Sequence, residues 1–339
     1  MHLMATTARK AGHGLNEAQL IGLLRNMITQ RAVDTRGFQL NRQGKIAIAM
    51  GSEGHEAVQA GAGLAFVRGK DVLYPYYRNT GIALACGLPL EDVFRSQFAR
   101  ATDTSAGRSI INHFSARERG IASISSIIAS QCTHAAGAAY AFKLRGEDRV
   151  VLCTFGEGAT SEGEWHEAIN FSAIHQVPVI WLCENNQWAI STPIAKQMRN
   201  AHVAERAAAY GLEGVSVDGF DPIAVYLAVR AAREKALAGK GPTLVEARCY
   251  RFLSHTTDDD DRTYRSREEV ERQRSQDPLP RFERFLIEQG VLTRESIDEL
   301  RAEISRGINE LTDRIEAEPY PNPSSLYGNV YSGSTEPWT

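Results

Sequence analysis

The first clear pattern in the chain is a set of apolar residues at helical spacing near the amino terminus. Within 16–32, apolar side chains recur every three or four positions, at Leu20, Ile21, Leu24, Met27 and Ile28. This spacing predicts an opening helix. Residues 130–149, SQCTHAAGAAYAFKLRGEDR, are rich in alanine and predict a second helix that ends near Gly146 and packs closely against its neighbours.

Strand-like and helix-like segments then alternate along the chain. Short apolar runs at 149–155, 177–185 and 242–252 predict three strands, and 161–174 and 222–237 predict helices between them. Strand–helix–strand units of this length form parallel sheets covered by helices on both faces. The expected fold class is therefore α/β, a parallel sheet flanked by helices, with a charged helical extension at the carboxy terminus.

This pattern divides the chain into four expected parts. Residues 1–45 would form an amino-terminal arm and helix, 46–253 the α/β core, 254–267 a mobile loop, and 268–339 a helical region with a proline-punctuated tail. The loop contains the acidic run from Asp258 to Asp261. That run is interpreted either as solvated or as a segment that becomes ordered when a ligand binds.

Composition and charge exclude several classes of function. The 339 residues are 43% hydrophobic and 23% charged with a net charge of −3, which does not favour nucleic-acid binding. No apolar stretch approaches the ~18–20 residues of a membrane span. The five cysteines show no CxxC spacing and are predicted to be buried core residues in a reducing compartment, the cytoplasm or, in a eukaryote, the mitochondrial matrix. The first residues lack an apolar signal core, so secretion is not expected.

Candidate chemistry first appears at the end of the first predicted strand, in the stretch TFGEGATSEGEWHEA. Glu157 stands between Gly156 and Gly158 at the strand's carboxyl end, where ligands of parallel α/β sheets gather. Ser161 and Glu164 match a capping box and predict the start of the following helix. A helix amino terminus favours an anion such as phosphate, but an acid at this place does not suit phosphate by itself. It does suit a divalent cation that carries phosphates. The alternative is that Glu157 only caps the helix.

A pair of asparagines ends the next predicted strand. Asn185 and Asn186 open the stretch NNQWAIST, directly after an apolar run. Amide oxygens are hard ligands of the kind that Mg²⁺ prefers, and oxygen donors at the ends of two neighbouring strands can share one metal. The alternative is a simple turn, because asparagine tolerates left-handed backbone.

Together, the Gly-Glu-Gly turn, the spacing and the asparagine pair match the thiamin diphosphate motif. Over nearly its whole length the chain resembles the α subunit of the E1 component of 2-oxo acid dehydrogenase complexes, with Glu157 where the general motif has Asp. The resemblance implies the phosphate-binding half of a thiamin diphosphate fold, in which Glu157, Asn186 and the backbone carbonyl of Trp188 hold Mg²⁺. The residues of the turn that would lie against the cofactor are Gly156, Gly158 and Ala159.

The same resemblance implies further contacts with the cofactor. In YPYYRNTG, Tyr77 and Arg78 would touch it, with the arginine on the phosphates, where its planar fork can donate two hydrogen bonds at once. His255 would reach the diphosphate and the reacting centre. Arg251 is interpreted as a phosphate contact or as half of a salt bridge to a partner subunit. Without the resemblance, Arg78 is interpreted as a surface or interface charge and His255 as a solvent-exposed loop histidine.

A third stretch, ASISSIIASQ, resembles the segment that cradles the aminopyrimidine ring of the cofactor. Ser126 and Ile128 would contact the ring. His113 stands where relatives have an active-site histidine, the alternative being a loop or core histidine. Ile127 replaces a proline that is common in this group. Some relatives bind a structural monovalent cation nearby, and the residues that would do so here are Ser125, Ser130 and Gln131.

The resemblance implies thiamin diphosphate-dependent decarboxylation of a 2-oxo acid and transfer of the acyl group to the lipoyl domain of an E2 component. Branched-chain 2-oxo acids are the expected substrates, because NNQWAIST, TYRS and PNPSSLYGNVY look most like the branched-chain enzymes. In this family a β subunit supplies the acid that activates the aminopyrimidine, so an α2β2 heterotetramer is expected. Two alternatives stay open: a pyruvate or acetoin dehydrogenase α subunit, and a non-catalytic paralogue that only binds a partner.

Overall fold

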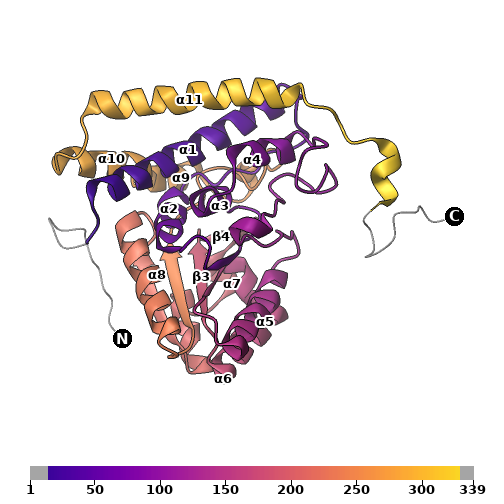
Figure 1. Ribbon diagram of the computed structural model, residues 1–339. Coiled ribbons are helices and arrows are strands. Elements are labelled where there is room, and N and C mark those ends of the chain that lie inside the picture. The colour runs from indigo at the N-terminus through magenta and orange to yellow at the C-terminus, as the bar shows by residue number, and fades with distance from the viewer. Residues whose placement is uncertain (1–13, 329–339) are drawn as a thin grey trace.

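A parallel five-stranded sheet forms the centre of the protein in the computed structural model, which describes residues 14–328 (Figure 1). The strand order is β1-β2-β3-β7-β6, and every neighbouring pair is parallel. A separate two-stranded ribbon follows β3. The strands are β1 (Val72–Tyr74), β2 (Val151–Gly156), β3 (Val179–Asn185), β4 (Trp188–Ala189), β5 (Thr192–Pro193), β6 (Glu213–Asp218) and β7 (Thr243–Arg248).

Helices cover both faces of this sheet, and α8 and α5 lie on opposite sides of it in Figure 1. The helix pair α2 and α8 packs on one face and the pair α5 and α6 on the other. The α-helices are α1 (Glu17–Arg42), α2 (Glu56–Ala65), α3 (Thr80–Cys86), α4 (Leu90–Gln97), α5 (Ser130–Arg145), α6 (Gly163–His175), α7 (Ile194–Gln197), α8 (Pro222–Leu237), α9 (Arg267–Arg274), α10 (Pro278–Glu288) and α11 (Arg294–Glu316). The expected α/β class is therefore confirmed.

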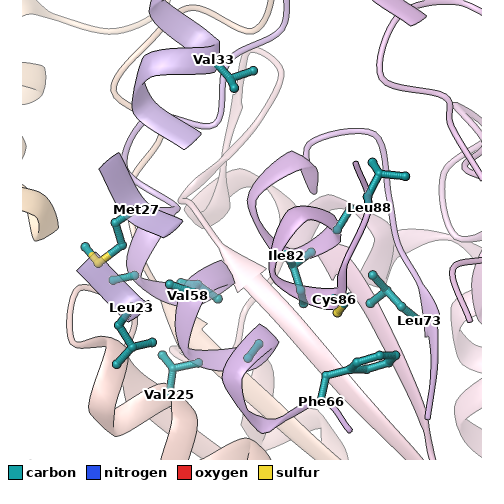
Figure 2. Packing of buried hydrophobic residues seen from close by; sticks show 14 of the residues in the cluster. Leu23, Met27, Val33, Val58, Phe66, Leu73, Ile82, Cys86, Leu88 and Val225 are labelled. Carbon is teal, nitrogen blue, oxygen red and sulfur yellow. The ribbon is translucent and has the colours of Figure 1, made fainter. Parts of the chain in front are cut away.

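Alternation along the buried strands divides the core into two clusters. Leu152 of β2 and Leu182 of β3 point into the cluster that includes α2 and α8, whereas Cys153 and Trp181 point into the cluster that includes α5 and α6. Successive side chains of a strand face opposite sides of a sheet, so a continuous apolar run serves both faces. Figure 2 shows part of the first cluster, where side chains of α1, α2, α3 and α8 meet.

The opening helix is ten residues longer than its local pattern predicts. Asn16 caps α1 through a capping box with Gln19, and the helix runs on to Arg42 with Val33 and Leu40 buried. The carboxy-terminal helix α11 lies along α1 in Figure 1, and Arg36 in the second half of α1 donates to the hydroxyl of Thr312 at 2.9 Å. This partner is distant in sequence, which explains why the prediction ended the helix too early.

Three details of the predicted elements need correction. Strands β1 and β6 were not predicted; β1 has only three residues, and β6 is half-exposed rather than continuously apolar. The strand β7 ends at Arg248, before the predicted end at 252. The predicted capping box is wrong, because Glu157–Ser161 form a 3₁₀ helix (η2), and α6 begins after Glu162 without a side-chain cap.

The five cysteines are buried and free, as the sequence predicts for core residues. Across residues 14–328, none of the helices combines the length and apolar character needed to cross a membrane.

Candidate functional site

The site is built at the carboxyl edge of the sheet, where the parallel strands end side by side. Gly156 of β2 pairs with Glu184 of β3, and Asn185 of β3 pairs with Arg248 of β7. Glu157 and Asn186, which follow β2 and β3, therefore leave the sheet at the same edge. Ligands of open α/β sheets bind at this edge, outside the carboxyl ends of the strands.

Glu157 is a buried carboxyl group with one oxygen still available. The side chain is 1% exposed, and its Oε2 accepts a hydrogen bond of 3.2 Å from the backbone N–H of Asn186. Its Oε1 has no hydrogen-bond partner among the residues described. Burial raises the pKa of Glu157 to about 7, although hydrogen bonds to its own backbone and to Asn186 act in the opposite direction. A divalent cation would satisfy the free oxygen and the charge together.

Asn186 lies beside this carboxyl group, as the sequence predicts, whereas Asn185 turns away. The amide Oδ1 of Asn186 accepts a hydrogen bond of 3.1 Å from the backbone N–H of Trp188. Gln187, which lies between Asn186 and Trp188, has a φ of 74°, and this left-handed backbone makes the turn tight. Asn185 instead donates to Glu246 at 2.6 Å. Of the two asparagines, only Asn186 hydrogen-bonds to Glu157, through its backbone N–H, and its side-chain oxygen caps the turn that carries Trp188.

Two buried arginines accompany the acid. Arg78 is 2% exposed and Arg251 is 1% exposed. Within residues 14–328, neither forms an ion pair with a carboxylate; Arg78 donates to the carbonyl of Gly51, and Arg251 donates to that of Ile190 at 2.9 Å. Burial, and then the charge of Arg78, lower the pKa of Arg251 to about 10. Unpaired buried charges are costly, so this arrangement fits an anion.

His255 links the first arginine to the loop that follows β7. The Arg78 guanidinium donates to Nδ1 of His255 at 3.1 Å, and the backbone N–H of His255 donates to Asp259 at 2.7 Å. Tyr77 packs its ring edge-on against the imidazole at 6.0 Å between centroids. Burial, and then the charges of Arg78 and Arg251, lower the pKa of His255 to about 4. His255 is half-buried and neutral at physiological pH, not the solvent-exposed alternative.

His113 and Ser126, which the sequence singled out separately, touch each other. The Ser126 hydroxyl donates to Nε2 of His113 at 2.6 Å, and Nδ1 of His113 donates to the carbonyl of Ile111 at 2.8 Å. Ser126 is exposed, and Ile127 and Ile128 are 70% and 39% exposed. The segment 126–128 therefore lies at the surface of this chain.

The residues expected to bind a structural cation make other hydrogen bonds. Ser125 accepts at 3.1 Å from the N–H of Ile127, and Ser130 donates to the Ile127 carbonyl at 2.8 Å. The side-chain amide of Gln131 donates to the carbonyl of Thr154 at 3.0 Å.

The two glycines that flank Glu157 have different reasons to be glycine. A Cβ added to Gly158 would lie 2.9 Å from the Cβ of Ala189, so Gly158 allows η2 to pack against the ribbon that follows Asn186. A Cβ on Gly156 would meet nothing within 4 Å. Gly156 therefore leaves open space over the turn, while Ala159 is 3% exposed and fills the core.

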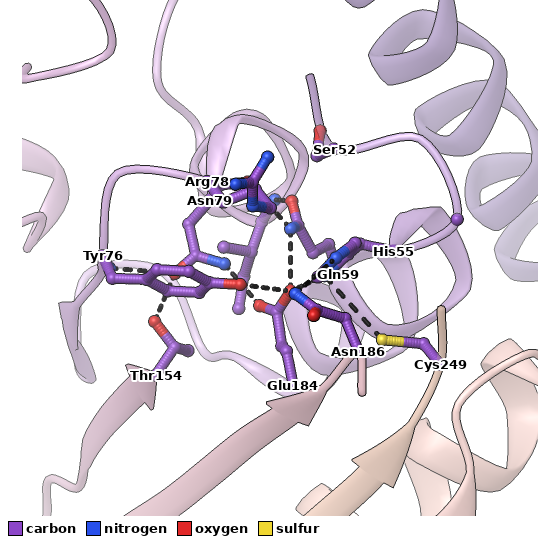
Figure 3. A network of polar contacts seen from close by, with 12 residues as sticks. Ser52, His55, Gln59, Tyr76, Arg78, Asn79, Thr154, Glu184, Asn186 and Cys249 are labelled. Carbon is purple, nitrogen blue, oxygen red and sulfur yellow. Dashed lines mark hydrogen bonds and ion pairs between the residues drawn. The ribbon is translucent and has the colours of Figure 1, made fainter. Parts of the chain in front are cut away.

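Sequence reasoning missed the polar network centred on Glu184 (Figure 3). Glu184 is fully buried, and its carboxylate is surrounded by four side-chain donors from two distant segments. They are His55, Gln59, Tyr76 and Asn79. The only local signal was an acid at the end of an apolar strand, in LCENN, and its partners lie more than 100 residues away.

The fold and the site define an α/β protein whose sheet edge fits a divalent cation beside an anion. The chain belongs to the dehydrogenase E1 component family, whose model matches residues 24–324. It is 42% identical to the 2-oxoisovalerate dehydrogenase subunit alpha of Bacillus subtilis, over 96% of this chain and 99% of the relative. The human mitochondrial 2-oxoisovalerate dehydrogenase subunit alpha is 36% identical, over 94% and 71% of the two chains.

A third relative is the 3-methyl-2-oxobutanoate dehydrogenase subunit alpha of Mycobacterium tuberculosis, which is 37% identical over 97% of this chain and 87% of its own. These similarities confirm the family that the sequence motif indicated.

Proposed function

We propose that the chain is the α subunit of a branched-chain 2-oxo acid dehydrogenase E1 component, which uses thiamin diphosphate and Mg²⁺. Its reaction would be the decarboxylation of a branched-chain 2-oxo acid and the transfer of the acyl group to the lipoyl domain of an E2 component. The relatives named for 2-oxoisovalerate and 3-methyl-2-oxobutanoate support the substrate, since they match 94–97% of this chain.

One observation supports the cofactor most directly. Glu157 has a buried oxygen without a partner, and the buried cations Arg78 and Arg251 have no carboxylate partner within residues 14–328. A cofactor that brings a divalent cation bound to a diphosphate would satisfy both kinds of group at once. Either group alone would fit many ligands, but the acid and the cations together fit a metal–diphosphate.

The proposed roles follow from this chemistry. Glu157, Asn186 and the backbone carbonyl of Trp188 hold Mg²⁺. Arg78 and Arg251 donate to the diphosphate. Gly156, Gly158 and Ala159 form the turn against which it lies, and Tyr77 packs beside His255.

His255 would act near the reacting centre as a neutral imidazole. Its Nδ1 accepts from Arg78, so the proton of the neutral ring is on Nε2, which can donate to a substrate oxygen. Thiamin diphosphate, when bound, supplies the electron sink for decarboxylation. The chain's own residues hold and orient the two reactants. Ser126, Ile128 and His113 would contact the aminopyrimidine end.

A β subunit would complete the site in an α2β2 heterotetramer. The exposure of Ile127 and Ile128 supports this proposal. A segment that binds an aromatic ring must be shielded from water, and in this chain alone these apolar side chains stay exposed. The isolated chain would then be inactive. The loop 254–267 would enclose the substrate and meet the lipoyl domain.

Two further proposals accompany this function. A monovalent cation would bind near Ser125, Ser130 and Gln131, and a dependence of the melting temperature on K⁺ would test it. The compartment would be reducing, either the cytoplasm or, in a eukaryote, the mitochondrial matrix, which is consistent with five free cysteines.

The test is to co-express the chain with its β subunit and measure binding and turnover. Mg²⁺-dependent binding of thiamin diphosphate and preference for 3-methyl-2-oxobutanoate over pyruvate are expected. A tenfold preference for pyruvate or acetoin would favour the related dehydrogenases instead. Absence of cofactor binding by a correctly assembled complex would favour a non-catalytic partner-binding protein.

A further inference from the structure

Glu184 is surrounded by side chains that can each donate a hydrogen bond to its carboxylate. Its Oε2 lies 2.6 Å from His55 Nδ1, 3.0 Å from Gln59 Nε2 and 3.2 Å from Tyr76 Oη, and its Oε1 accepts from the Asn79 amide. A carboxylate can accept from all four groups, whereas a protonated carboxyl would have to donate to one of them. We take Glu184 as an acceptor at every contact.

This acceptor fixes the tautomer of His55. Because Glu184 only accepts, Nδ1 of His55 carries a proton and donates to it. The other ring nitrogen, Nε2, lies 3.3 Å from the side-chain nitrogen of Asn186. An amide NH₂ group can only donate, so Nε2 accepts a hydrogen bond from the Asn186 amide. His55 is 0% exposed, so water does not compete for either nitrogen.

The orientation of the Asn186 amide follows from its two partners. Its NH₂ group faces the lone pair of His55 Nε2, and its Oδ1 accepts from the backbone N–H of Trp188 at 3.1 Å. If the amide were rotated by half a turn, its NH₂ would face the Trp188 N–H, and its oxygen would face a ring nitrogen that has no proton to donate. Both contacts would be repulsive, so the oxygen is held on the side of the turn.

We propose that His55 is a positioning residue for the metal site: with Glu184 behind it, it holds the Asn186 amide so that Oδ1, not the NH₂ group, faces the cation. This inference rests on the proposed function, since it concerns the same Mg²⁺ site. His55 itself does not touch the metal. Its role is that of an outer partner that orients a metal ligand, and losing such a partner typically costs 10–100-fold in metal affinity.

Two substitutions separate the two nitrogens of His55. Asn places a polar group where Nδ1 stands, so His55→Asn keeps a donor to Glu184 and loses the acceptor for Asn186. Gln reaches the position of Nε2, so His55→Gln keeps an acceptor for Asn186 and loses the contact with Glu184. Both variants remove the ring, which makes them matched controls for the loss of volume.

The experiment titrates MgCl₂ into the assembled α and β subunits at saturating thiamin diphosphate and follows the quenching of tryptophan fluorescence. The apparent dissociation constant for Mg²⁺ should rise about tenfold in His55→Asn and less than about threefold in His55→Gln. Melting temperatures of the cofactor-free complexes should fall at least as much in His55→Gln as in His55→Asn, because Gln gives up the contact with Glu184. A purely structural role would therefore weaken Mg²⁺ binding at least as much in His55→Gln as in His55→Asn.

Each other outcome overturns a stated claim. If the unaltered complex shows no Mg²⁺-dependent binding, the proposed function fails and the inference fails with it. If the unaltered complex binds normally and His55→Asn binds Mg²⁺ equally well, the inference alone fails. If Gln weakens binding as much as Asn does, the contact with Glu184 or the ring volume matters and the orientation of the amide does not.

Discussion

Glu184 and Glu157 are two buried carboxyl groups on neighbouring strands of one sheet edge, yet their surroundings differ. Glu184 lies within β3 and receives hydrogen bonds from four side chains. Glu157 follows β2, receives one backbone hydrogen bond at Oε2 and leaves Oε1 without a partner among the described residues. The group around Glu184 is complete within this chain, whereas the group around Glu157, Arg78 and Arg251 is incomplete.

This difference distinguishes structural polar groups from groups that await a ligand. Buried polar atoms in folded proteins nearly always have hydrogen-bond partners, so an unpartnered buried oxygen needs an explanation. Both acids are nearly fully buried, at 0% and 1% exposure, so burial alone does not separate them. The hydrogen-bond inventory does, and it predicts that the same substitution lowers stability at Glu184 and weakens ligand binding at Glu157.

The largest effect on the fold is expected at Glu184. Glu184→Ala leaves buried donors on two other segments without an acceptor, and breaking a buried polar group of this kind typically costs roughly 3–5 kcal/mol. Chemical unfolding of the cofactor-free complex would measure the loss. Glu157→Ala is the matched control and should change the unfolding free energy by less than about 1 kcal/mol. Equal destabilisation by the two substitutions would remove the distinction between the acids.

The next largest effect concerns the cofactor. Glu157→Ala should weaken Mg²⁺-dependent binding of thiamin diphosphate by more than about 100-fold, because it removes a proposed metal ligand and not merely an outer partner. Isothermal titration of the assembled enzyme would measure the change. The fold should survive, since the described hydrogen bond of the Glu157 side chain to another residue goes to a backbone group, the N–H of Asn186. Unchanged Mg²⁺-dependent affinity would refute the role of Glu157.

A third buried acid, Asp34, has hydrogen-bond partners in this chain, as Glu184 has, and a raised pKa, as Glu157 has. It is 6% exposed, and its Oδ2 accepts from the backbone N–H and the hydroxyl of Ser52 at 2.7 and 3.0 Å. Burial raises the pKa of Asp34 to about 7, although the Ser52 hydrogen bonds lower it. The folded protein therefore keeps this proton over a pH range in which the unfolded chain, with an ordinary pKa near 3.8, has lost it.

The pH dependence of stability follows from this shift. As pH rises from 5.5 to 7, the native state goes from about one proton more than the unfolded state to about half a proton more, so its stability falls by about 1.6 kcal/mol over that range. Asp34→Asn removes this contribution. The unfolding free energy of the variant should therefore gain about 1.6 kcal/mol relative to the unaltered chain between the two pH values. Parallel pH profiles would show that Asp34 does not titrate in this window.

The smallest effect is expected where a local motif was misread. Ser161 makes no cap for α6, so Ser161→Ala should change the unfolding free energy by less than about 0.5 kcal/mol. Asn16 does cap α1 through a capping box, and Asn16→Ala should cost about 1 kcal/mol. Thermal melts of the two variants would test the contrast. A larger loss at Ser161 would mean that the turn after Glu157 depends on capping after all.

Much of the fold was accessible from the sequence because its signals are local. The helix at 222–237 was predicted with the bounds that α8 has, and the buried strands β2 and β3 follow from their apolar runs. The edge strands were not accessible, because β6 is half-exposed and carries no periodic signal. The length of α1 was also out of reach, since the helix that supports its second half comes more than 250 residues later.

The sequence by itself determined the positions of Glu157 and Asn186, because each follows a strand that its own apolar residues define, and parallel strands end at one edge. The sequence could not determine that Glu184 has all its hydrogen-bond partners within this chain whereas Glu157 does not. That depends on hydrogen bonds between segments 105 to 129 residues apart, such as those from Asn79 and His55 to Glu184. Such contacts form only when the chain folds, and hydrogen-bond geometry between distant residues leaves no periodic trace in the sequence.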